Sequence, residues 1–104
     1  MRHVMVRYKV RADQAEENAR LIGEVFAALR RDTPPGLTYS AYTLEDGVSF
    51  VHVASMVDGA NNPLQQLAEF KAFTAGVKER CEVPPVTTTL REIGSYSAED
   101  AWSR

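Results

Sequence analysis

The order of strand-like and helix-like stretches limits most strongly what this chain can fold into. Residues 3–10, 37–44, 48–57 and 86–96 are rich in β-branched and aromatic residues, which is typical of strands. Residues 13–31 and 62–81 instead repeat apolar residues every three or four positions, as one face of an amphipathic helix does. The sequence therefore predicts strand, helix, strand, strand, helix, strand.

Turn and capping residues separate these stretches. Asp13 is the expected N-cap of the first helix. Residues 33–36, with the sequence TPPG, are expected to end that helix. Residues 46–47, Asp-Gly, predict a tight hairpin between two strands. Asn62, which a proline follows, is the expected N-cap of the second helix.

This order predicts an α+β fold of the βαββαβ type. Both helices would pack on one face of a four-stranded antiparallel sheet. Right-handed crossovers would place the first and third strands side by side in the centre of the sheet. We expect residues 1–96 to form a single domain and residues 97–104 to form a C-terminal tail. Trp102 of this tail either docks on a partner subunit, which its large aromatic ring favours, or is loose.

Composition excludes several classes of protein. The apolar runs are only a few residues long, whereas a membrane-spanning helix needs about 20. The formal net charge of −2 lacks the basic excess of a nucleic-acid-binding protein. The single cysteine cannot form an intrachain disulfide, and the first residues do not resemble a secretory signal. We therefore expect a cytoplasmic protein without a nucleic-acid or membrane partner.

The alternation of side chains along the two central strands predicts two faces. We expect Val4, Val6, Tyr8 and Val10, with residues 49, 51, 53, 55 and 57, to lie beneath the helices. The helix-free face would then carry His3, Met5, Arg7, Lys9, Val48, Phe50, His52, Ala54 and Met56. This face is too apolar to stay in water and too polar for a core, which predicts a homodimer paired through it. Alternatively, the long Arg7 and Lys9 side chains cover the apolar residues of a monomer.

Four stretches give the chain a resemblance to a known family. They are the opening HVMVRYKV, the hairpin LEDGVSFVHVASM, the helix LAEFKAFTAGVKERC and the closing REIGSY. In pattern and position they resemble the dimeric α/β-barrel superfamily of ferredoxin-like proteins, and within it the small antibiotic biosynthesis monooxygenase-like proteins. The resemblance implies a ferredoxin-like fold, a homodimer and a pocket between sheet and helices. The family ranges from cofactor-free oxygenases of aromatic polyketides and quinols, through haem-degrading enzymes, to proteins without known activity.

His52 is the candidate catalytic residue, because it lies in the middle of a strand on the mixed face. An imidazole there could act as acid or base near neutral pH. Cofactor-free oxygenation needs such a group, since a phenol or enol must lose a proton before its anion reacts with oxygen. The alternative is a half-buried histidine that forms a hydrogen bond across the dimer interface.

Candidate substrate-binding residues surround His52. Arg7 could hold an anionic substrate through its planar guanidinium, or could pair with an acidic residue instead. Tyr39 and Tyr42 lie on opposite faces of one strand, so at most one of them lines the pocket. The apolar members of the set are Met5, Phe50 and Met56.

Metal ions and cofactors are not expected. His3 and His52 have no ligand-spacing motif around them, and the Asn-Trp-His set of the haem-degrading relatives does not map onto this sequence. An RNA-recognition domain would need a basic residue where Asp46 stands. Two functions remain: a cofactor-independent monooxygenase of a small aromatic or polyketide-type molecule, or a non-catalytic barrel that binds a small hydrophobic ligand or is purely structural.

Overall fold

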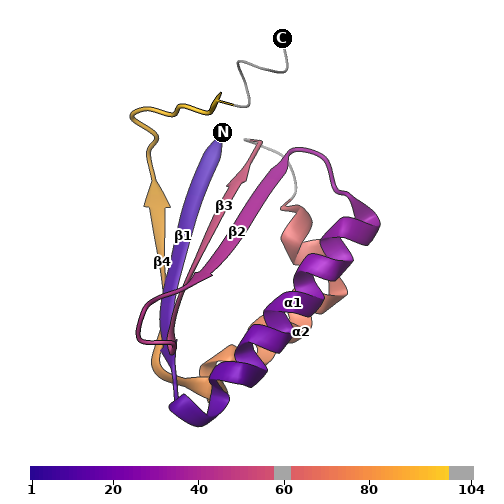
Figure 1. The fold of residues 1–104 in the computed structure, drawn as a ribbon. Coiled ribbons are helices and arrows are strands. Elements are labelled where there is room, and N and C mark those ends of the chain that lie inside the picture. The colour runs from indigo at the N-terminus through magenta and orange to yellow at the C-terminus, as the bar shows by residue number, and fades with distance from the viewer. Residues whose placement is uncertain (58–61, 99–104) are drawn as a thin grey trace.

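The computed structural model of the chain describes residues 1–57 and 62–98. Two helices cover one face of a four-stranded sheet, and within the described residues no helix lies on the other face (Figure 1). The elements are β1 (Arg2–Val10), η1 (Ala12–Gln14), α1 (Ala15–Asp32), β2 (Leu37–Thr43), β3 (Ser49–Met56), η2 (Pro63–Gln66), α2 (Ala68–Arg80) and β4 (Cys81–Leu90). This is the ferredoxin-like order predicted from the sequence.

The sheet has the strand order β2-β3-β1-β4, with β1 and β3 in the centre as predicted. All neighbouring strands are antiparallel, so residues that lie opposite each other share a face of the sheet. Val6 lies opposite His52, and Tyr8 lies opposite Phe50. The helix-covered face therefore holds the even-numbered residues of both β1 and β3.

This register corrects the predicted face of β3. Phe50, His52 and Met56 are buried beneath the helices, not on the open face. The Phe50 ring stacks on Tyr8, with centroids 5.6 Å apart. The alternation in residues 49–57 could not reveal this, because Val51 and its odd-numbered neighbours are as suitable for a core as the even-numbered residues. On the open face, β3 instead contributes Val51, Val53 and Ser55, beside Met5, Arg7 and Lys9 of β1.

The β2–β3 hairpin is built around Asp46. Its carboxylate accepts hydrogen bonds from the backbone N–H groups of Val48 and Ser49, at 3.0 and 2.8 Å, and from the Ser49 hydroxyl at 2.6 Å. These bonds lower the pKa of Asp46 to about 2. Gly47 has a φ of 75°, which glycine adopts without strain. The Asp-Gly turn predicted from the sequence is therefore confirmed.

Both predicted helix starts need correction. Asp13 lies inside η1 and makes no capping bond, and α1 begins only at Ala15. Asn62 is an N-cap, since its side chain accepts a 3.0 Å hydrogen bond from the Leu64 N–H. It caps the short 3₁₀ turn η2, however, and not α2. The extended backbone of Leu67 separates η2 from α2. No helix in residues 1–57 and 62–98 is long and apolar enough to cross a membrane.

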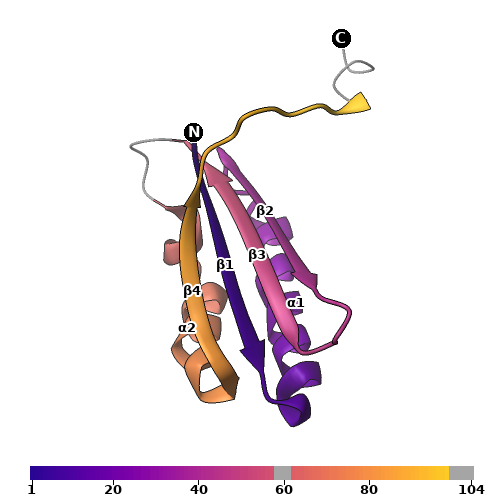
Figure 2. The same ribbon diagram turned by 90° about the vertical axis from the view of Figure 1, so that its left-hand side faces the viewer.

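The fourth strand also differs from the prediction. β4 spans Cys81–Leu90 and follows α2 directly, whereas a strand was expected at 86–96. It lies at the edge of the sheet, where its two prolines are tolerated because one side of an edge strand needs no hydrogen bonds. Beyond β4 the chain leaves the sheet in an extended course (Figure 2), and Ile93 is 99% exposed there. Trp102, the expected docking residue, lies outside the described residues.

Candidate functional site

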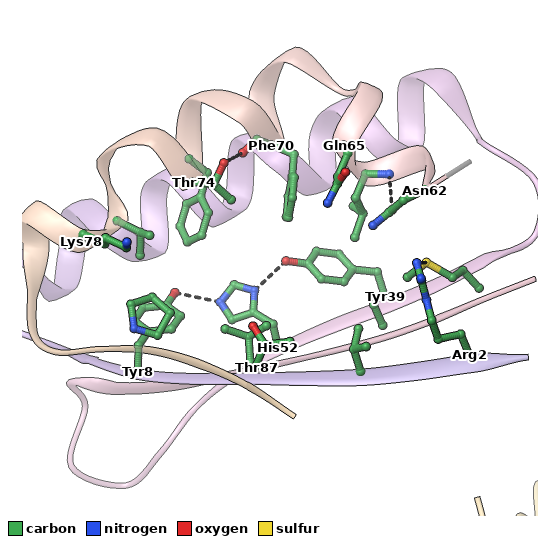
Figure 3. Close-up of a pocket in the computed structure, with 18 residues that line it drawn as sticks. Arg2, Tyr8, Tyr39, His52, Asn62, Gln65, Phe70, Thr74, Lys78 and Thr87 are labelled. Atoms are coloured by element: carbon green, nitrogen blue, oxygen red, sulfur yellow. Dashed lines mark hydrogen bonds between the residues drawn. The ribbon is translucent and has the colours of Figure 1, made fainter. Parts of the chain in front are cut away.

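A cavity of about 530 Å³ lies between the helix-covered face of the sheet and the elements η2 and α2. Most of its wall is apolar and includes Val4, Val6, Ala54, Leu64, Phe70 and Phe73. Figure 3 shows Lys78 and Arg2 toward its two ends, with Tyr8, His52 and Tyr39 between them on the sheet. A cavity of this size and polarity is suited to a small, largely hydrophobic molecule.

The polar centre of the cavity is His52, which is 5% exposed. Its Nε2 atom lies 2.8 Å from the Tyr8 hydroxyl, and its Nδ1 atom lies 2.6 Å from the Tyr39 hydroxyl. The three side chains come from β3, β1 and β2, and their rings are close together on one face of the sheet (Figure 3). Both imidazole nitrogens are therefore occupied by phenol groups.

The hydrogen-bonded chain continues away from the cavity into the helices. The Asn18 amide Nδ2 donates to the Tyr8 hydroxyl at 2.9 Å, and the Asn18 Oδ1 accepts from Arg80 Nε at 3.1 Å. Asn18 is 0% exposed and Arg80 is 8% exposed. We call the five side chains Arg80, Asn18, Tyr8, His52 and Tyr39 the polar chain.

Arg80 is a buried cation without a carboxylate partner in the described part of the chain. Its guanidinium carbon lies 5.2 Å from the centroid of the Phe73 ring, and its NH2 group donates to the Phe73 carbonyl at 3.4 Å. Gly76 leaves room for it, because a Cβ atom at that position would lie 2.9 Å from the guanidinium. The neutral amide of Asn18 is therefore a main polar contact of this charge.

Comparisons with solved structures show which proteins share this fold. An antibiotic biosynthesis monooxygenase matches 90% of this chain over 100% of its own, with a TM-score of 0.73 and 13% identity. The protein Rv0793 from Mycobacterium tuberculosis matches 92% of this chain over 98% of its own, with a TM-score of 0.74 and 20% identity. The chain has the fold of the antibiotic biosynthesis monooxygenases.

A third structure with this monooxygenase fold is a variant of SnoaB, a cofactor-independent oxygenase from Streptomyces nogalater. It matches 90% of this chain over 94% of its own, with a TM-score of 0.67 and 12% identity. No family profile matches the sequence, and no curated protein matches it. The resemblance described from the sequence is thus confirmed for the fold, and at these identities it does not extend to a reaction.

Within this fold, the predicted site residues are divided between two faces. His52, Tyr39 and Met56 line the large cavity, so Tyr39 is the strand tyrosine that reaches it. Met5 and Arg7 instead line a groove of about 300 Å³ that opens on the helix-free face.

The other two predicted binding residues are not in the cavity wall. Tyr42 is 59% exposed and shares the helix-free face with Val51, which lies opposite it. Phe50 is buried in the core against Tyr8. Neither of them is placed to contact a molecule held beside His52.

Burial keeps the aromatic part of the polar chain uncharged. It lowers the pKa of His52 to about 4 and raises that of Tyr8 to about 12. Burial also raises the pKa of Tyr39. At neutral pH the imidazole and both phenols are therefore neutral, and each imidazole nitrogen is occupied by a phenol hydroxyl.

Sequence reasoning missed Asn18 and Arg80. A signal for both exists, because each is a polar residue at a helix position that should be buried. Asn18 shares the spacing of Val25 and Ala28 on α1, and Arg80 follows Phe73 and Val77 on α2. A polar residue on such a face needs a buried partner.

Metal-ligating groups are sparse in the described residues. Residues 1–57 and 62–98 contain no group of three or more His, Cys, Asp or Glu side chains that could hold a metal ion. Cys81 is half-buried at the start of β4, where burial raises the pKa of its thiol. A raised pKa makes the reactive thiolate scarcer at neutral pH.

Proposed function

We propose that the protein is a cofactor-independent monooxygenase that oxidises a small aromatic or polyketide-type molecule in the cavity beside His52. The observation that carries this proposal is a largely apolar cavity of about 530 Å³ with an imidazole between two phenols at its polar centre. Apolar walls exclude water from a reactive carbanion, and a fixed hydroxyl can stabilise the oxygen on which its charge resides. The names of structures with the same fold are in line with such chemistry.

The proposed reaction needs no external reductant. An anthrone-type CH2 group next to a ring system loses a proton to solvent as the molecule enters the cavity, which gives an enolate, and O2 adds to the same carbon. The resulting peroxide anion takes up a proton from solvent, and the hydroperoxide then loses water and leaves a carbonyl group. One oxygen atom stays in the product, and the other leaves as water with the two hydrogens of the original CH2. Tyr39 would bind the enolate oxygen, and His52 would act through Tyr39 by holding its hydroxyl at 2.6 Å.

Oxygen uptake tests this function. We expect the wild-type protein to consume O2 with at least one member of a panel of anthrones, hydroquinones and phenols. Tyr39→Phe is expected to lower kcat/KM by roughly 100-fold, because it removes the hydrogen-bond donor to the developing oxyanion. His52→Ala should have an effect in the same direction. Tyr42→Phe is the matched control, since it removes the same atom from the same strand on the opposite face and should leave the rate unchanged.

The outcomes separate the two functions that the sequence left open. If no compound is oxidised but one of them raises the Tm of the protein, the cavity binds ligands without catalysis. If oxidation is unchanged in both Tyr39→Phe and His52→Ala, the enzyme class stands and the proposed residues are wrong.

We also infer that two copies pair through the helix-free face of the sheet. Tyr42 at 59% exposure and Val86 at 60% exposure lie on this face, and Val86 lines its groove together with Met5 and Arg7 of the central strand β1. Exposed aromatic and aliphatic side chains on one flat face favour a self-complementary contact. The charged Arg7 and Lys9 would need polar partners in it.

Sedimentation velocity at micromolar concentration tests the pairing. We expect the wild-type protein to sediment as a dimer and Val86→Arg to sediment as a single chain, because it adds a further cation beside Arg7, which lies opposite position 86, to the buried contact. Ala27→Arg, on the exposed side of α1, is the control and should remain dimeric. A single-chain particle for the wild type would contradict the proposed interface.

A further inference from the structure

The polar chain runs from the buried cation Arg80 to Tyr39 in the wall of the cavity. The donor and acceptor atoms of each side chain limit which of its neighbours can receive a hydrogen bond from it. We propose that all of its hydrogen bonds point from Arg80 toward Tyr39, so that the cavity selects a ligand oxygen that accepts a hydrogen bond. The accepted class is a carbonyl, quinone or enolate oxygen on an aromatic ring system. This inference deepens the proposed function and rests on it, since both place the ligand against Tyr39.

The direction is set at the Arg80 end. A guanidinium has five N–H donors and no acceptor, so the Asn18 atom that faces Arg80 Nε at 3.1 Å must be the carbonyl oxygen. The other end of the same amide is then the NH2 group, which faces the Tyr8 hydroxyl at 2.9 Å. Asn18 therefore cannot accept a hydrogen bond from Tyr8.

The Tyr8 hydroxyl transmits this direction to His52. Tyr8 is buried, and in the described part of the chain its hydroxyl contacts only Asn18 and His52. Because Asn18 donates to it, its own proton must go to Nε2 of His52, 2.8 Å away. A buried O–H without an acceptor is strongly disfavoured. Nε2 is therefore an acceptor, and the neutral imidazole carries its proton on Nδ1.

The hydrogen bond between His52 and Tyr39 is the last in the polar chain, and it decides which atom Tyr39 offers to the cavity. With its proton on Nδ1, His52 donates to the Tyr39 oxygen at 2.6 Å. In residues 1–57 and 62–98 the Tyr39 hydroxyl has no other hydrogen-bond partner, so its proton is free for a molecule in the cavity that Tyr39 lines. A ligand oxygen with a lone pair satisfies this donor, whereas an N–H group would face it with a second donor.

Nitrogen-15 NMR of the histidine rings tests the direction without any ligand. The chain has two histidines, and His3→Gln leaves His52 as the only imidazole. His3 points to the opposite face of the sheet, so this variant leaves the polar chain in place. We expect the nitrogen shifts of a neutral ring protonated on Nδ1. A ring protonated on Nε2 would overturn the proposal.

Asn18→Asp provides a reversed control of nearly the same shape. The new carboxylate has no donor, so it accepts from Arg80 and also from the Tyr8 hydroxyl. Tyr8 then accepts from Nε2, and Nδ1 accepts from Tyr39. We expect the proton of His52 to move from Nδ1 to Nε2 in this variant. If the proton stays on Nδ1, the direction is not set by Asn18 and the proposal is wrong.

Three flat tricyclic compounds of similar size test the selectivity by titration calorimetry. Fluorenone has an acceptor oxygen, carbazole has a donor N–H, and fluorene has neither. We expect the wild-type protein to bind fluorenone about tenfold more tightly than carbazole, and Asn18→Asp to lose or invert this preference. If all three bind equally, the proposed function stands and the selectivity is wrong. If none of them binds, the proposed occupancy of the cavity by aromatic molecules is itself wrong.

Discussion

Replacing Asn18 by leucine is expected to lower the free energy of unfolding by roughly 2–4 kcal/mol. Leucine has the same branched side-chain skeleton as asparagine and is not smaller, so the loss does not come from a cavity. It comes from Arg80, whose buried charge would lose its side-chain acceptor and keep only the 3.4 Å hydrogen bond to the Phe73 carbonyl, and from Tyr8, whose hydroxyl would lose a donor. Removing one partner from a buried charged group is among the most destabilising of single substitutions. Urea denaturation of the two proteins measures the difference.

A second substitution separates this explanation from poor packing. Arg80→Met removes the charge that Asn18→Leu leaves without a partner, so the double variant should be more stable than Asn18→Leu alone. Asn18→Asp keeps an acceptor for Arg80, so its free energy of unfolding should fall much less than that of Asn18→Leu. If Asn18→Leu lowers the free energy of unfolding by less than about 1 kcal/mol, the Arg80 guanidinium reaches solvent in the variant. The hydrogen bonds of the polar chain would then not be rigidly held.

The strand order, the central position of β1 and β3 and the Asp-Gly hairpin could all be predicted from the sequence. These features depend on local patterns, such as Asp46 and Gly47 in the turn or the apolar spacing along α1. The face of β3 could not be predicted, because both sets of its side chains are apolar enough for a core. Only the register against β1, with Tyr8 opposite Phe50, decides which set is buried.

In the candidate site, too, single residues could be identified from local patterns, whereas the contacts between them could not. His52 and Tyr39 were identified from their strands, but their hydrogen bond depends on the β2–β3 pairing that places both beneath the helices. Asn18 and Arg80 are 62 positions apart in the sequence, and nothing local connects them. The sequence marks each of them only as a polar residue on an apolar helix face. Their joint role became visible once the two helices were packed together.

The stability of the protein is expected to fall by about 3 kcal/mol between pH 7 and pH 4 because of His52 alone. Burial lowers its pKa from 6.5 to about 4 in the folded protein. Below pH 6.5 the unfolded chain binds a proton on this ring, while the folded protein does so only near pH 4. Unfolding therefore takes up a proton in this window, and stability present above pH 6.5 is lost as the pH falls toward 4. Below pH 4 both states are protonated and the loss stops.

Denaturation at several pH values, repeated with His52→Gln and His3→Gln, measures this contribution. His52→Gln should flatten the dependence between pH 6.5 and 4, whatever its effect on overall stability, and His3→Gln should retain it. The Asp46 carboxylate, with a pKa lowered to about 2 from 3.8, contributes stability that is lost mostly below pH 4. The two effects are therefore separable on one pH series. An unchanged slope in His52→Gln would mean that the imidazole is solvated in the folded protein and that the cavity around it is wet.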